Sequence, residues 1–380
     1  MTPTHTALPA LFSPIRFGTL ELANRIVIPP MCMYSAEDGC ATDWHLMHYG
    51  NLAQSGAGLL VLEATAVEAR GRISRYDLGL WNDAQVQALR PVLAHIRRHS
   101  PMPVCIQLAH AGRKASSLRP WEGGGAMPAT HPDAWPTLSA SAQGFLPTDP
   151  LPASATLQDI ADIKQAFTDA AVRAHALGLD AVELHAAHGY LLHQFLSPLS
   201  NLRTDAYGGS LEGRMRLTLE VFDAMQAALP TGFPLGVRIS ATDWVEGGWD
   251  VAQSQVLAHA LAERGCAFLH VSSAALHPAQ QIPIAPGYQV PLATALRNSL
   301  NGCMPVIAVG LITEAQQAEA IVQTGQADAI GVARAMLYNP RWPWEAARQL
   351  GTQVAAAPQY LRCEPHGAKG LLHAAPATTD

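Results

Sequence analysis

Two histidines and a tyrosine lie close together within residues 180–190. His185, His188 and Tyr190 follow a short apolar run, which itself comes after Gly178, a residue type that commonly ends a helix. Polar groups rarely gather at the end of a buried strand without a partner, because burying an unpaired polar group costs free energy. The segment therefore indicates a catalytic or ligand-binding site. A metal-binding pair, or histidines hydrogen-bonded within the core, are the alternatives.

The strands that would hold such a site recur along the whole chain. Apolar segments of strand length alternate with segments of helical periodicity, and they fall within residues 24–34, 58–65, 103–110, 180–190, 234–240, 267–272, 304–310 and 327–334. This alternation predicts an α/β protein with a (β/α)8 TIM barrel, whose strand carboxyl ends form the site. A doubly wound sheet is the rival fold. It is disfavoured because no G-x-G-x-x-G motif follows the first strand.

The length of 380 residues fits a single barrel domain with insertions, spanning residues 1–380. Residues 1–10 are expected to be a flexible amino terminus. Residues 111–155 lose periodicity in favour of Pro, Gly, Ser and Trp, which predicts a lid or capping insertion after the third strand. Residues 363–380 are low in apolar periodicity and are expected to form a flexible tail.

The composition is that of a globular enzyme. Hydrophobic residues make up 49% of the chain and charged residues 14%, and the net charge of −6 gives no reason to expect nucleic acid or an anionic membrane as partner. Neither a signal peptide nor a membrane-spanning run is recognisable, so a soluble, cytoplasmic protein is expected. The six cysteines lack C-x-x-C spacing, which argues against a zinc site. The three lysines lie away from the expected strand ends, which argues against Schiff-base chemistry.

The loops after the seventh and eighth strands are suited to a phosphate. In barrels of this type, backbone N–H groups and a helix start commonly bind phosphate at these loops. Here the loops carry Gly310, Ala333 and Arg334. The two small residues permit close approach of the backbone, and the guanidinium can bind phosphate through two hydrogen bonds. A phosphorylated ligand is therefore expected.

Other strand ends carry groups suited to a redox-active heteroaromatic ring. Gln107 can donate and accept at the amide edges of a ring, and Arg238 can stabilise negative charge that develops on reduction. Cys32 would place a sulfur near the ring, and Ala64 would leave room for a flat ligand. For Arg238, a salt bridge inside the barrel is the alternative interpretation.

The histidine pair would then serve a second molecule stacked on the ring. His185 and His188 could donate two hydrogen bonds to one carbonyl oxygen and polarise it as electron density arrives. Tyr190, whose ordinary pKa is about 10, would be protonated at neutral pH and could deliver a proton.

These residues resemble the Old Yellow Enzyme flavoproteins, and within them the thermophilic-like ene-reductases. The resemblance extends from Leu11 to about Arg362. Its most specific motifs lie at residues 30–34, 107–113, 185–190, 200–209 and 333–334.

The resemblance implies a TIM barrel that binds FMN non-covalently, is reduced by NADPH or NADH, and is reoxidised by a small activated alkene. It implies that Cys32 tunes the flavin's redox potential. The residues expected to contact FMN are Pro29, Pro30, Met31, Cys32, Ala64, Gln107, Arg238, Ala333 and Arg334, with Gly310 at the phosphate.

The resemblance also implies roles on the substrate side. Tyr34, His185 and His188 would hold the carbonyl or nitro group while hydride passes to the β-carbon, and Tyr190 or a water would protonate the α-carbon. Residues 359–362 are similar to an element with which relatives insert an arginine into the neighbouring subunit's site. Arg362 would be that arginine, in a homodimer or homotetramer.

Three other functions are alternatives. A metal-dependent barrel hydrolase could use the histidine pair, but it would need further His or Asp ligands at other strand ends. A non-catalytic FMN-binding protein would bind the flavin without turnover. Related dehydrogenases or demethylases usually carry an iron–sulfur cluster, which the cysteine spacing here cannot bind.

Overall fold

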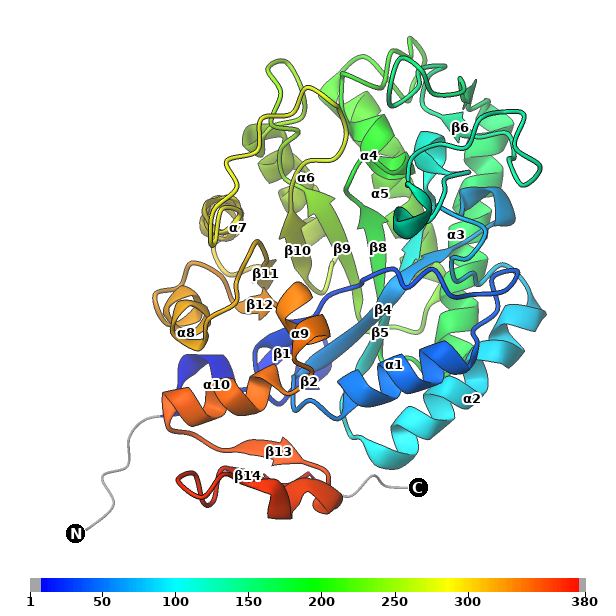
Figure 1. The fold of residues 1–380 in the computed structure, drawn as a ribbon. Coiled ribbons are helices and arrows are strands. Elements are labelled where there is room, and N and C mark those ends of the chain that lie inside the picture. The colour runs from blue at the N-terminus through cyan, green and yellow to red at the C-terminus, as the bar shows by residue number, and fades with distance from the viewer. Residues whose placement is uncertain (1–7, 376–380) are drawn as a thin grey trace.

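A closed barrel of parallel strands forms the centre of the molecule (Figure 1). The structure is a computed structural model that describes residues 8–375, and within them eight strands close the barrel, which confirms the predicted TIM-barrel fold. In barrel order they are β3 (Ile26–Ile28), β4 (Leu59–Ala66), β5 (Val104–Ala109), β8 (Ala181–Ala186), β9 (Leu235–Ser240), β10 (Leu269–Ser272), β11 (Val306–Ala308) and β12 (Ala329–Gly331).

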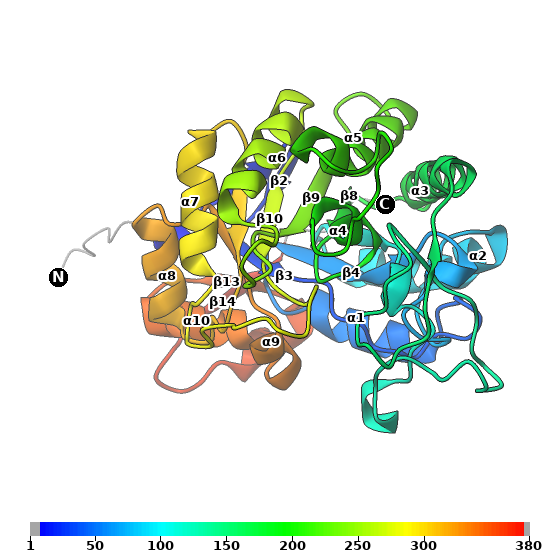
Figure 2. The ribbon, with the colours of Figure 1, turned by 90° about the horizontal axis from the view of Figure 1, so that it is seen from above.

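Helices surround the barrel, as Figure 2 shows from above. Their amphipathic faces cover strands that are buried on both sides, which is why those strands are continuous apolar runs in the sequence. The helix that follows the insertion begins after Thr156, because the Asp159 N–H donates to Thr156 Oγ1 at 3.0 Å. The helices are α1 (Asp43–Ala53), α2 (Asp83–His99), α3 (Leu157–Ala176), α4 (Leu191–Leu196), α5 (Leu211–Ala228), α6 (Val251–Glu263), α7 (Val290–Leu300), α8 (Ala315–Gln323), α9 (Arg334–Tyr338) and α10 (Trp342–Leu350).

A hairpin that the sequence pattern does not predict closes the amino-terminal end of the barrel. It consists of β1 (Ile15–Phe17) and β2 (Leu20–Leu22), whose Phe17 and Leu22 are fully buried. The Phe17 and Phe268 rings lie 4.9 Å apart between centroids. Gly236 makes room for Phe268, since a Cβ at that position would lie 2.3 Å from the ring. The barrel floor is therefore a packed apolar layer.

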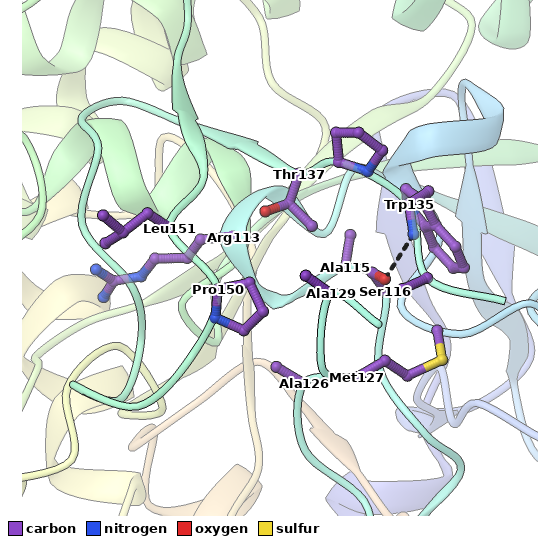
Figure 3. Close-up of a pocket in the computed structure, with 12 residues that line it drawn as sticks. Arg113, Ala115, Ser116, Ala126, Met127, Ala129, Trp135, Thr137, Pro150 and Leu151 are labelled. Carbon is purple, nitrogen blue, oxygen red and sulfur yellow. Dashed lines mark hydrogen bonds between the residues drawn. The ribbon is translucent and has the colours of Figure 1, made fainter. Parts of the chain in front are cut away.

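The insertion at residues 111–155 lies at the end of the barrel opposite β13 and β14 (Figure 1). It contains the short 3₁₀ helices η3 (Gly112–Lys114) and η4 (Pro120–Glu122) and a parallel pair, β6 (Leu138–Ser139) and β7 (Ala153–Ser154). Figure 3 shows a cavity of about 270 Å³ within the insertion, bordered by Arg113, Ser116 and Trp135. The backbone N–H of Trp135 donates to Ser116 Oγ at 3.0 Å. The insertion, which we call the cap, is thus a folded segment with hydrogen bonds of its own.

The carboxy-terminal segment has regular structure that its apolar pattern does not predict. After η5 (Pro358–Cys363), strand β14 (Leu372–Ala374) pairs in parallel with β13 (Val354–Ala356). Glu364 supports this pair, because its carboxylate accepts from the N–H groups of Leu372 at 2.7 Å and Gly370 at 3.1 Å. The segment expected to be a flexible tail therefore contains a paired strand, β14, after an irregular stretch, and residues 376–380 lie outside the described residues.

From Ala10 onward, the amino-terminal segment is hydrogen-bonded to α8 on the outside of the barrel. The Ala10 and Leu11 N–H groups each donate to the Glu319 carboxylate at 2.8 Å. Most of the segment expected to be flexible, residues 1–7, lies outside the described residues. Across the described range, no helix is both long and apolar enough to cross a membrane.

Candidate active site

Barrel register brings the predicted polar residues together at the carboxyl ends of neighbouring strands. His185 on β8 pairs with Arg238 on β9, and Gln107 on β5 pairs with Glu183 on β8. Because paired residues of parallel strands point to the same side of the sheet, these side chains share the barrel interior.

His185, His188 and Tyr190 form one cluster. The His185 ring centroid lies 5.2 Å from that of His188 and 5.1 Å from that of Tyr190. Burial, followed by the charge of Arg238, holds the pKa of both histidines well below the ordinary value. Burial also raises the pKa of Tyr190 well above its ordinary value. Both imidazoles are therefore neutral at pH 7, and the phenol keeps its proton.

Hydrogen bonds fix which ring atoms of the histidines face a ligand. The Ala187 N–H donates to His185 Nδ1 at 3.3 Å, so the proton of the neutral ring is on Nε2. His188 Nε2 lies 2.8 Å from Ser272 Oγ, which leaves Nδ1 available. His188 has φ of 58°, and its N–H donates to Ser240 Oγ at 2.9 Å, which holds this left-handed turn.

Lys114, which the sequence pattern does not place at a strand end, lies beside this cluster. Its Nζ donates to the backbone oxygens of His188 at 2.8 Å and Ala275 at 3.0 Å. The ammonium is also 5.0 Å from the Tyr190 ring centroid. Burial, and then the charge of Arg113, lowers the pKa of Lys114 to about 8. Lys114 follows β5 through η3, and no periodic signal marks that irregular turn.

Arg238 is buried without a carboxylate partner. Its side chain enters none of the ion pairs within residues 8–375, and its Nε has no hydrogen-bond partner there. The salt-bridge interpretation is therefore not supported. A buried guanidinium of this kind is available to an anionic or electron-rich ligand.

Gln107, Ala64 and Cys32 occupy the neighbouring wall. Gln107 donates from Nε2 to Glu183 at 2.7 Å, which leaves its Oε1 and second N–H for a ligand. A register shift between Leu62 and Ala64 marks an irregularity of β4 at the small residue. Burial, and then the charges of Asp77 and Glu63, raises the pKa of the Cys32 thiol well above its ordinary value. Cys32 is therefore a neutral thiol.

Buried side chains also hold the loop that carries Cys32 and Tyr34. The Met33 N–H donates to Glu63 Oε2 at 3.0 Å, and the Tyr49 hydroxyl donates to Glu63 Oε1 at 2.7 Å. Glu63 lies inside the apolar run of β4, so the sequence pattern does not single it out. Its contacts fix the loop on which two predicted site residues lie.

A second cavity, of about 160 Å³, collects the predicted phosphate residues. Gly310 has φ of 113°, and a Cβ there would lie 2.9 Å from the Gln289 side chain, so only glycine fits. Tyr288 and Gln289 were not predicted, because they lie in an irregular stretch before α7. Predicted residues on its wall are Pro29, Arg238, Gly310, Ala333 and Arg334.

The remaining predicted residues lie elsewhere. Pro30 and Met31 are partly exposed in the loop after β3. Tyr34 borders a third cavity, of about 330 Å³, together with Lys114 and residues of the cap. Arg362 is exposed in η5, which adjoins β14, and it borders none of these three cavities.

The geometry also bears on the hydrolase alternative. Within residues 8–375, no group of three or more His, Cys, Asp or Glu side chains is placed to hold a metal ion. The histidine pair is instead surrounded by Ser272, Tyr190 and Lys114, which are hydrogen-bonding groups for an organic ligand.

Comparisons with known proteins show which family the chain resembles. Residues 10–353 match the NADH:flavin oxidoreductase / NADH oxidase family. The chain is 44% identical over 354 residues to an NADPH dehydrogenase of Geobacillus sp. strain WCH70, covering 93% of this chain and 98% of that protein. It is 42% identical over 365 residues to NADH:flavin oxidoreductase FG08077 of Gibberella zeae, covering 92% and 88%. Morphinone reductase has a similar structure, with a TM-score of 0.75 at 27% identity and coverage of 99% and 96%.

The chain belongs to the NADH:flavin oxidoreductase / NADH oxidase family, which confirms the resemblance to Old Yellow Enzyme. The protein is an oxidoreductase with FMN as cofactor and a nicotinamide dinucleotide as reductant. The residues present fit FMN, because the unpartnered Nε of Arg238 and the glycine cradle at Gly310 border the same cavity as Arg334.

Proposed function

We propose that the protein is an ene-reductase for α,β-unsaturated carbonyl or nitro compounds, with NADPH or NADH as hydride source. The observation that carries this proposal is the cluster of two neutral imidazoles and a protonated phenol beside Arg238. Neutral imidazoles donate hydrogen bonds without adding charge, which suits an oxygen that becomes negative as hydride arrives. The names of the dehydrogenase relatives support NADPH as the reductant.

FMN held in this site would supply hydride transfer between the nicotinamide and the alkene. The chain's part is to hold the flavin and set its electronics. Arg334 would bind the phosphate beside Gly310 and Ala333, while Gln107 and Arg238 would bind the ring. The other proposed contacts are Pro29, Pro30, Met31, Cys32 and Ala64.

The histidine pair would hold the substrate. His185 would donate from Nε2 to the carbonyl or nitro oxygen. His188 would donate from Nδ1 once the Ser272 hydroxyl turns from Gln289 Oε1, 3.1 Å away, to donate to His188 Nε2. Tyr34 would line the substrate pocket together with the cap. Tyr190, or a water, would then protonate the α-carbon.

We also propose a homodimer or homotetramer in the cytoplasm. Arg362 is exposed and borders none of the chain's own site cavities, which is consistent with a guanidinium that serves a neighbouring subunit. This arrangement would complete each site with one residue from the partner.

An anaerobic absorbance experiment tests the proposed function. Addition of NADPH to the FMN-loaded protein should bleach the flavin bands, and cyclohexenone should restore them. Bleaching without restoration by several enones, maleimides or nitroalkenes would refute the ene-reductase proposal. A protein that binds FMN and shows neither half-reaction would be the non-catalytic flavin binder.

A further inference from the structure

A carboxylate lies in the middle of the barrel, one layer below the histidine pair. Glu183 on β8 is fully buried and pairs in register with Gln107 and Gly236 on the neighbouring strands. The next layer down is apolar, with Ala181 on the same strand and Phe268 from β10, both buried. Glu183 therefore separates the apolar floor from the proposed flavin site.

Two side chains donate to Glu183, one to each oxygen. Gln107 Nε2 lies 2.7 Å from Oε1, and His270 Nδ1 lies 2.7 Å from Oε2. Burial alone would raise the pKa of Glu183, but His270, Arg238 and Gln107 outweigh it and lower the pKa. The carboxylate is therefore ionised, and His270 Nε2 has no partner in the part of the chain that the structure describes.

A buried carboxylate is costly to keep. Replacing such a group by an apolar residue is often neutral or stabilising, so stability alone does not account for it. The hydrogen bond to the Gln107 amide suggests why the carboxylate of Glu183 is retained. An amide can rotate to exchange its oxygen and nitrogen, and the bond to Glu183 allows one orientation only. The amide that faces the site is thus preset.

We propose that Glu183 is a positioning residue for the flavin: it orients the Gln107 amide toward the ring and balances the positive charge of Arg238. This inference rests on the proposed function, because it takes Gln107 and Arg238 as ring contacts. His270 holds the second oxygen and keeps the carboxylate from turning away from Gln107.

The two parts of this role have separate consequences. In E183Q, the new side chain has one oxygen and one NH2 group, so it no longer accepts from both Gln107 and His270. When the NH2 group faces Gln107, the Gln107 amide turns to offer its oxygen, and the preset orientation is lost. The variant also leaves the charge of Arg238 unbalanced. A reduced flavin carries more negative charge than an oxidised one, so an unbalanced cation favours the reduced state.

The experiment measures the dissociation constant of FMN and the midpoint potential in E183Q, H270N and E220Q. E183Q should weaken FMN binding by about tenfold or more and shift the potential to a more positive value. H270N is the matched variant, because it alters the same layer but keeps the carboxylate, so its potential should stay near that of the wild type. E220Q removes a carboxylate that pairs with Lys164 at 2.7 Å, outside the barrel, and should change neither quantity.

A folded E183Q with wild-type FMN affinity and potential would overturn the inference. If E183Q does not fold, E183D keeps the charge but is too short to reach both donors. It should weaken FMN binding and leave the potential unchanged, and wild-type affinity in E183D would refute the positioning role. Failure of the proposed function is distinguishable, because it would appear in the wild type as absent half-reactions, whatever the variants do.

Discussion

The electrostatic environment of single residues determines what this site can do. His185 and His188 are neutral because burial and nearby cations, Arg238 and Lys114 among them, lower their pKa values. Each neutral ring carries one N–H. The Ala187 N–H fixes that of His185 on Nε2, whereas the proton position of His188 depends on whether the Ser272 hydroxyl donates to His188 or to Gln289. The histidines can therefore stabilise a substrate oxygen that becomes negative through hydrogen bonds, without carrying a positive charge themselves.

Removing both imidazoles should impair the oxidative half-reaction specifically. In H185A/H188A we expect the rate of flavin reoxidation by cyclohexenone to fall by roughly a hundredfold or more, because both donors to the substrate oxygen are lost. FMN content should be retained. Stopped-flow absorbance measures the rate, and the control is H95A/H99A on the exposed face of α2. An unchanged reoxidation rate in the double variant would disprove the assigned role.

Lys114 should give the oxidative half-reaction a pH dependence. Its pKa is lowered to about 8, so its charge beside the substrate site is lost as pH rises through that value. We expect kcat/KM for cyclohexenone to fall through this range in the wild type. In K114R the charge persists, since an arginine pKa exceeds about 12, and the fall should disappear. The same step in K114R would assign it to another group.

Lys114 should also make the stability of the folded protein depend on pH. The pKa of Lys114 is about 8 in the folded protein against an ordinary 10.5, so between these values the unfolded chain binds more protons. The free energy of unfolding therefore rises with pH between these two values. Below about pH 8 the buried Lys114 is charged, and its destabilising effect is largest. Denaturant titration measures the free energy of unfolding at pH 7.5 and at pH 10. This free energy should increase more between the two pH values for the wild type than for K114M. An equal increase would contradict the lowered pKa.

Not every site residue could be found from the sequence. His185, His188 and Tyr190 were predictable because they end an apolar strand, and so were Gln107 and Arg238 within such strands. Glu183 and His270 also lie in apolar strands, but nothing local shows that they meet. Their contact depends on barrel register across a sequence separation of 87 positions. The sequence shows which groups are buried, and only the closed barrel shows which of them are partners.

At the scale of elements, the loops after β5, β8 and β10 are held together by hydrogen bonds. Side chains of the first loop donate these bonds to backbone oxygens of the other two. Lys114 joins the loop after β8 to the loop after β10, where Ala274 and Ala275 both have positive φ, 72° and 71°. Arg113 adds a bond of 2.7 Å from Nη2 to the Leu276 oxygen. Positive φ at alanine costs free energy, so these contacts hold a strained loop against the site.

Gly189 should be intolerant of any side chain for this reason. It has φ of 70°, and a Cβ there would lie 2.2 Å from the Ala275 oxygen. We expect G189A to lower the free energy of unfolding by roughly 3 kcal/mol or more and to reduce enone turnover. Urea titration measures the first effect.

Gly178 provides the matched control for that substitution. It has φ of 80°, and within residues 8–375 a Cβ there would meet no heavy atom within 4 Å beyond Gly178 itself and the chain next to it. G178A should therefore cost only about 1 kcal/mol of backbone strain. Equal losses in the two variants would show that the contact with Ala275 is unimportant.

The strands were predictable as elements, and the short connections were not. Strands buried on both faces are continuous apolar runs, which is why all eight were predicted from the sequence. The short strands β1, β2, β13 and β14 are each partly exposed, so they do not form the continuous buried apolar runs that mark the barrel strands. The positions of these four strands depend on the surfaces against which they pack. Those surfaces exist only after the barrel has closed.

At the scale of the whole molecule, the proposed exchange of Arg362 between subunits can be tested by mixing. R362A would keep a complete barrel but lack the arginine, whereas H185A/H188A would lack the histidines but keep the arginine. A dimer of one of each would contain one complete site. Random reassociation should therefore restore about a quarter of wild-type activity. No restoration, in mixtures shown by native mass spectrometry to contain the mixed dimer, would place Arg362 outside the neighbouring site.

The packed floor of the barrel has a consequence for the order of events in turnover. Phe17, Leu22 and Phe268 are fully buried and block passage along the barrel axis. We therefore expect the nicotinamide and the proposed alkene substrate to reach the flavin from the same side, the end of the barrel that carries the cap. Sharing that side, each reactant would have to leave before the other binds, so we predict ping-pong kinetics in which an excess of either reactant inhibits binding of the other.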